Sequence, residues 1–75
     1  MNISQNEIEK ITNIVKTKLP NEVYTNKVIR NGNLIIKIYS EVSLFEINEI
    51  QNQIEGWDIF LSPDEDYLEL IFKRH

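Results

Sequence analysis

The sequence predicts one α+β domain in which a helix followed by a β-hairpin occurs twice, in the order αββαββ. Two stretches carry apolar residues at helical spacing, and each begins at a serine that is suited to cap a helix. Two pairs of β-prone runs follow these stretches, and a turn signal separates the runs of each pair. We expect a four-stranded, mostly antiparallel sheet with two helices packed on one face, formed by residues 1–75 as a single domain.

The first helix is expected over residues 4–19. Ser4 with Glu7 three positions later forms a capping box, which marks where the helix begins. Pro20 disfavours helical geometry at the preceding residue and marks the end. The apolar stripe between these limits consists of Ile8, Ile11, Ile14, Val15 and Leu19.

The first hairpin is expected over residues 22–40, with Asn31-Gly32 at its tip. Asn-Gly is a strong hairpin signal because both central positions of a type I′ turn need a positive φ. This register places Ile29 opposite Leu34 on one face of the ribbon. On the other face it places Val28 opposite Ile35 and Tyr24 opposite Tyr39.

The second helix is expected over residues 43–55 and begins as the first one does. Ser43 and Glu46 form a second capping box, and the apolar stripe continues through isoleucines at positions 47, 50 and 54. Gly56 is suited to the left-handed residue that closes a helix. The repetition indicates either an ancient duplication of an αββ unit or convergence on good helix starts.

The second hairpin is expected over residues 57–73, and residues 62–66 are expected to form the turn. Ser62-Pro63-Asp64 fits the first three places of a type I turn, and Leu61 is expected to pair with Leu68 across it. In this register the core face carries Trp57, Ile59, Leu61, Leu68, Leu70 and Phe72. The opposite face carries Asp58, Phe60, Tyr67, Glu69, Ile71 and Lys73.

The sheet face away from the helices is the first candidate binding surface. Its aromatic members are expected to be Tyr24, Tyr39, Phe60 and Tyr67, interleaved with apolar and charged side chains. Tyrosine and phenylalanine are enriched in interface cores, so this face predicts a protein partner or a homodimer through stacked sheets. Two alternatives are that these side chains cover one another across the strands, and that the aromatic residues stack on RNA.

The charge of the chain is divided between its two halves. Residues 1–40 hold six lysines and arginines against three acids, whereas residues 41–75 hold nine acids against two basic residues. Such a chain lacks the clustered basic residues of a nucleic-acid binder but suits a basic partner. The candidate partner-binding carboxylates are Glu46, Glu49, Asp64, Glu65, Asp66 and Glu69.

Residues for catalysis are scarce. The chain has no cysteine, its single histidine is His75 at the last position, and no glycine-rich turn precedes a helix. The acids at 64–66 lack the alternating oxygens and mid-loop glycine of a calcium loop. We therefore expect no enzyme, cofactor or metal. A solvated turn, a weak divalent-cation site and a small carboxylate-based enzyme are the alternatives for this loop.

The functional expectation is a small non-enzymatic interaction protein, of the inhibitor, immunity or phage anti-host kind. A structural homodimerising domain is the alternative. No apolar run is long enough to span a bilayer, and the first residues lack a signal-peptide pattern, so we expect a cytoplasmic protein without a membrane partner. Thirteen isoleucines, nine asparagines and no alanine are typical of a low-GC bacterium or its phage.

Overall fold

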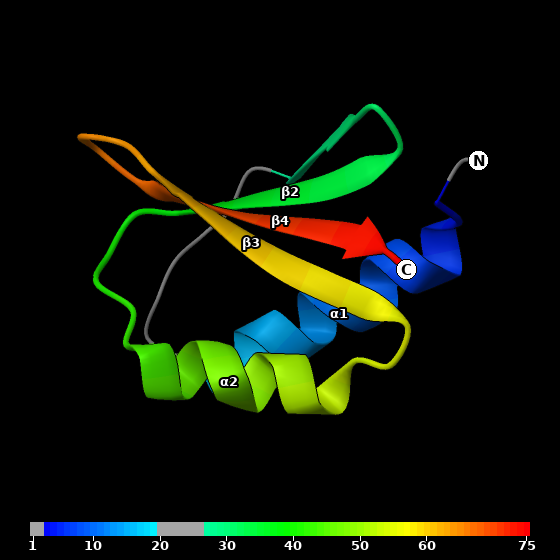
Figure 1. Ribbon diagram of the computed structural model, residues 1–75, viewed down its shortest axis with the longest axis horizontal. Helices are drawn as coiled ribbons and strands as arrows, with labels where there is room; N and C mark the ends of the chain where they lie inside the picture. The colour runs from blue at the N-terminus through cyan, green and yellow to red at the C-terminus, as the bar shows by residue number, and fades with distance from the viewer. Residues whose placement is uncertain (1–2, 20–26) are drawn as a thin grey trace.

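The computed structural model describes residues 3–19 and 27–75 and has the predicted element order αββαββ (Figure 1). Its elements are α1 (Gln5–Lys18), β1 (Lys27–Arg30), β2 (Asn33–Ile38), α2 (Leu44–Gln53), β3 (Trp57–Pro63) and β4 (Leu68–Arg74). No helix in the described part of the chain is long and apolar enough to cross a membrane.

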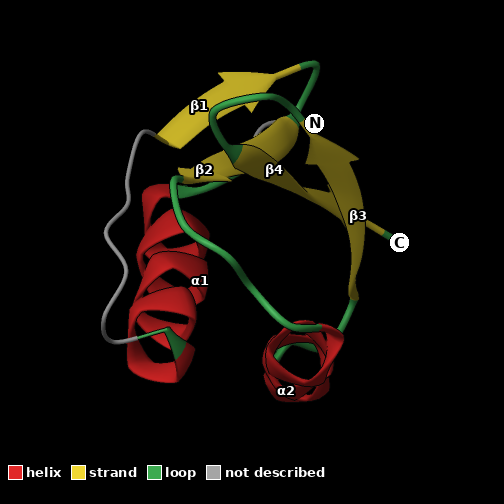
Figure 2. Cartoon of the chain, turned by 90° about the vertical axis from the view of Figure 1, so that its left-hand side faces the viewer, coloured by secondary structure: helices red, strands yellow, loops and turns green. Residues whose placement is uncertain are grey.

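The four strands form one antiparallel sheet in the order β1-β2-β4-β3. The last strand of the chain, β4, is therefore central, and β1 and β3 are the edges. Both helices lie on one face of the sheet and leave the other face without a helix (Figure 2). This arrangement confirms the predicted fold class.

Both helices begin at the predicted capping boxes. The Glu7 backbone N–H donates to the Ser4 hydroxyl at 3.2 Å, and the Ser4 backbone N–H donates to the Glu7 carboxylate at 3.0 Å. The same reciprocal pair joins Ser43 and Glu46, at 3.1 and 2.9 Å. Each serine and each glutamate thus satisfies one backbone donor that the first helical turn leaves free.

The core lies between the sheet and the two helices. Its centre is formed by side chains of the two middle strands, β2 and β4, that point toward the helices. Each middle strand has a neighbouring strand on both sides, and the helices cover this face of the sheet. Its fully buried members are Ile11 of α1, Ile50 of α2, Leu34 and Ile38 of β2, and Leu70 and Phe72 of β4. Helix α1 adds Val15, helix α2 adds Ile47, and Trp57 closes the core at the start of β3.

The first hairpin has the predicted register. Ile29 pairs with Leu34 and Val28 pairs with Ile35, and the tip residues Asn31 and Gly32 have φ values of 55° and 80°. These are the positive dihedral angles that a type I′ turn requires. The expected pairing of Tyr24 lies outside the described residues.

The second hairpin corrects the predicted register by two residues. Leu61 pairs with Leu70 rather than Leu68, and β3 continues through Pro63, so the tip spans residues 64–67. The Asp64 N–H donates to the Tyr67 carbonyl at 2.8 Å and closes this shorter tip. A shift of two residues preserves the alternation of a strand, so the predicted assignment of residues to the two sheet faces holds.

Three further expectations are corrected, on the end of α2, the place of Gly56 and the burial of Leu61. Helix α2 ends at Gln53, and Ile54 leaves it in an extended conformation and turns into the core. Gly56 has the expected positive φ, 84°, but lies in the turn that leads to β3 rather than at the helix end. Leu61 was expected in the core and is 41% exposed, because it lies in the outer half of an edge strand.

A charged clasp joins the C-terminal end of the sheet to the start of α1. The Arg74 guanidinium donates two hydrogen bonds to the Glu7 carboxylate, at 2.7 and 2.8 Å, and stacks over the Trp57 ring at 4.5 Å. The Arg74 hydrogen bonds, together with the Ser4 backbone N–H, lower the pKa of Glu7 to about 2. The clasp favours the ionised carboxylate in the folded protein.

This shift predicts a pH dependence of stability. Because the folded pKa of Glu7 is depressed, its contribution is complete above the ordinary pKa of 4.5 and is lost as the pH falls toward about 2. Urea unfolding at several pH values should show that Glu7→Gln is less stable than the parent at pH 6 and that this difference narrows by pH 2. Glu9→Gln serves as the control. A difference that persists unchanged at pH 2 would contradict the role of the Glu7 charge.

Candidate functional site

The open face of the sheet carries the residues expected there, and many of them cover one another. The ladder pairs place Val28, Ile35, Ile71 and Phe60 in one row across the four strands. Ile35 in this row is buried although both helices lie on the other side of the sheet. The row is therefore only partly available, with Phe60 at one edge as its most exposed member at 48%.

Long basic side chains lie over the aromatic rings of this face. Lys37 Nζ lies 4.8 Å from the centre of the Tyr67 ring, and Lys73 Nζ lies 5.0 Å from that of Phe60. Tyr39 contacts Tyr67 with ring centres 5.5 Å apart. These contacts agree with the alternative that cross-strand neighbours cover the face. Tyr24, the fourth aromatic candidate, lies outside the described residues.

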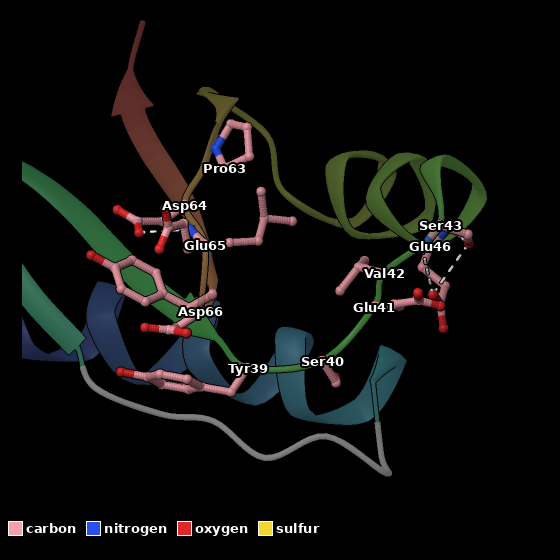
Figure 3. A pocket seen from close by; sticks show the side chains of 12 residues that line it. Tyr39, Ser40, Glu41, Val42, Ser43, Glu46, Pro63, Asp64, Glu65 and Asp66 are labelled. Atoms are coloured by element: carbon pink, nitrogen blue, oxygen red, sulfur yellow. Dashed lines mark hydrogen bonds between the residues drawn. The ribbon is translucent and has the colours of Figure 1, made fainter.

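A groove of about 710 Å³ lies between two loops of the candidate region. One wall is the segment from β2 to α2, residues 39–43 with Glu46, and the other wall is the tip of the second hairpin, residues 63–68. Figure 3 shows the residues of these two walls, with Asp64, Glu65 and Asp66 at one end of the groove and Glu41 and Glu46 at the other. We call this feature the acidic groove. It unites six of the ten predicted partner-binding residues, namely Tyr39, Glu46, Asp64, Glu65, Asp66 and Tyr67.

Among the described residues, five carboxylates line the acidic groove, and no lysine or arginine does. Glu46 is held by its capping box, and Asp64 accepts a hydrogen bond from the Glu65 N–H at 2.7 Å. Among the described residues, the carboxylates of Glu41, Glu65 and Asp66 have no hydrogen-bond or ion-pair partner. Three acceptor groups are thus free to meet a cation from outside.

The remaining predicted residues lie elsewhere. Glu49 forms an ion pair with Lys18 of α1 at 3.3 Å, so this candidate carboxylate already has a basic partner within the chain. Glu69 lies on the open face, 3.9 Å from Arg30. The lysine that pairs with the Glu49 carboxylate belongs to α1. The sequence of α2 alone therefore does not reveal this ion pair.

Two exposed apolar side chains beside the acidic groove were not predicted as site residues. Leu44 and Phe45, in the first turn of α2 between the groove residues Ser43 and Glu46, are each 72% exposed. Exposure of two adjacent large apolar groups is informative, because a helix normally turns such residues toward the core. The exposure of Phe45 could have been predicted from the sequence, because this residue falls outside the apolar stripe formed by the isoleucines at 47, 50 and 54.

Among the described residues, no group of three or more histidine, cysteine, aspartate or glutamate side chains is placed to hold a metal ion. His75 contacts Asp58 at 2.8 Å, at the opposite end of β3 from the groove. Comparison with protein-family models, curated proteins and solved structures finds no match to this chain.

Proposed function

We propose that this chain is a non-enzymatic protein-interaction domain that binds a basic protein surface through the acidic groove. One observation carries the proposal: in the part of the chain that the structure describes, five carboxylates from two separate segments line one groove without any lysine or arginine among them. Such a concentration of one charge raises the local concentration of cationic partners and speeds their association. Leu44 and Phe45 beside it add apolar area that a protein partner buries and a free metal ion does not.

The proposal includes the kind of role that such a domain plays. An inhibitor, an immunity factor or a phage-encoded anti-host factor acts by covering a surface of another protein, and a chain of 75 residues needs no reaction chemistry for that. A cytoplasmic location is part of this proposal. The homodimer through stacked sheets has less support, because Lys37 and Lys73 already lie over aromatic rings of the open face.

The test is neutralisation of the hairpin tip by isosteric substitution. We expect the triple variant Asp64→Asn, Glu65→Gln, Asp66→Asn to bind an acetylated hexalysine peptide about tenfold more weakly at low salt, since each exposed ion pair contributes up to about 1 kcal/mol. Isothermal titration at two salt concentrations measures this loss, which should shrink at high salt. The same pair of proteins is then used for affinity capture from lysate, where the variant should retain less of the captured partner.

The control carries the same change in net charge at other positions: Glu9→Gln, Glu55→Gln and Asp58→Asn. These side chains are exposed and lie outside the acidic groove. If the groove is the binding site, the control should keep most of the affinity for hexalysine. Equal losses in the two triple variants would show that net charge alone attracts the peptide, and the groove would then have no special role.

A further inference from the structure

The outer edge of β3 is partly closed by a side chain instead of a strand. The Gln51 amide Nε2 donates to the Trp57 carbonyl at 2.7 Å, and the Ile59 N–H donates to Gln51 Oε1 at 3.1 Å. These two backbone groups face away from β4, which pairs with the other side of β3. Gln51 thus takes the place of a neighbouring strand along the first half of the edge and protects it from other chains.

No residue that the structure describes covers the second half of the same edge in this way. In an antiparallel ladder alternate residues direct both backbone groups to the same side, so Leu61 and Pro63 face outward as Trp57 and Ile59 do. Proline has no N–H, and its position on the outer side of an edge strand therefore removes no bond to β4. The free half offers one N–H, that of Leu61, and the carbonyls of residues 59, 61 and 63. Among the described residues, none bonds to the outward groups of Leu61.

Exposed apolar side chains flank this free half on both faces of the sheet. Phe60 is 48% exposed on the open face, and Leu61 is 41% exposed on the helix side. An extended chain that pairs with an edge gains main-chain hydrogen bonds, and its alternate side chains meet those of the edge strand. The free half of β3, residues 60–63, supplies both kinds of contact.

A second copy of this chain fits the free half poorly. Two β3 strands paired antiparallel about Leu61 would exchange only the two Leu61 bonds. The next pair on each side would set Ile59 against Pro63, where proline lacks a donor and the Ile59 N–H is already bound by Gln51. The edge is rich in acceptors, so its partner needs free N–H groups, which β3 of a second copy does not supply. An extended segment of a different protein meets this requirement.

We propose that the free half of β3 binds an extended segment of the protein partner as a fifth strand. The basic residues that adjoin this segment at its Pro63 end then enter the acidic groove, which begins at Pro63 where the free edge ends. The assignment of basic residues rests on the proposed function, whereas the strand pairing rests on the edge alone.

The test uses an acetylated peptide of alternating valine and threonine with lysines at both ends, so that lysines lie at the Pro63 end in either strand direction. We expect the peptide at saturation to slow hydrogen exchange of the Leu61 amide, measured by NMR. The variant Leu61→Pro, which removes the single free N–H, should bind about tenfold more weakly. Leu61→Ala keeps the N–H and should lose less. Proline at 61 leaves the ladder to β4 intact because this N–H faces outward, and the β4 amide signals verify the fold.

A second measurement avoids any change in the protein. Only alternate residues of a bound strand direct their N–H groups toward β3. One peptide is therefore N-methylated at its valines and another at its threonines. We expect one of the two peptides to lose binding and the other to keep it. Equal outcomes would overturn the strand pairing. Shifts of the Asp64–Asp66 amides without protection of Leu61 would overturn it too, while leaving the proposed function in place. Absence of binding by this peptide also overturns it, and the hexalysine titration then decides the proposed function separately.

Discussion

Phe72→Ala is expected to lower the free energy of unfolding by about 3–5 kcal/mol, the range for removing a fully buried phenylalanine. Phe72 is 0% exposed and lies in the central strand β4, paired with Leu34 of β2 and Ile59 of β3. Alanine leaves a cavity that neighbours on two strands and the helices below fill only in part. A domain of this length has a total stability of roughly 4–11 kcal/mol, so the variant should be close to unfolding at 37 °C.

Urea denaturation followed by tryptophan fluorescence measures this loss, because Trp57 is buried against the same core. Phe60→Ala is the matched control. The same atoms are removed there from the open face, where the ring is 48% exposed and contacts Lys73. Its expected cost is about 1 kcal/mol or less. Similar costs at the two positions would contradict the assignment of the two sheet faces.

The elements were predictable from sequence because the signals that define them are local. Each capping box lies within four residues, and Asn31-Gly32 fixes the first hairpin through the dihedral angles of its own two residues. Apolar periodicity then assigned the strand faces correctly. The strand order was not predictable, because pairing of β2 with β4 depends on contacts between residues thirty or more positions apart.

The register of the second hairpin shows where local signals fail. Ser62-Pro63-Asp64 fits a turn, but Pro63 is equally compatible with the outer side of an edge strand. The two registers place the same residues on each face, so the apolar pattern does not distinguish them. To choose between the two registers one must know that β3 is an edge strand. The position of β3 at the edge follows only from the assembled sheet.

The acidic groove was predictable in its chemistry and not in its shape. The excess of acids after residue 40 indicated a negative end of the molecule, and the hairpin tip supplies three of the groove's carboxylates. Glu41 joins them only because the segment after β2 lies opposite that tip. Glu49 leaves the set because Lys18 approaches from α1. Both outcomes depend on tertiary contacts between distant segments.

Gln51→Ala is the second substitution with a large expected effect. It removes both hydrogen bonds to the edge of β3 and leaves the Ile59 N–H and the Trp57 carbonyl without a protein partner. A lost pair of this kind costs about 1–3 kcal/mol of unfolding free energy. The variant should also self-associate, since the freed Ile59 N–H can now donate to the Pro63 carbonyl of a second copy paired about Leu61.

Gln51→Glu separates these two effects. At neutral pH its carboxylate still accepts from the Ile59 N–H but has no donor for the Trp57 carbonyl. We therefore expect a smaller loss of stability than with alanine and no self-association, because the Ile59 donor stays occupied. Urea denaturation and light scattering after gel filtration measure the two properties. Gln51→Ala could instead be as stable as the parent and elute as the same species. The Gln51 amide would then not protect this edge, and the difference between the bonded and the free half of β3 would not affect stability or association.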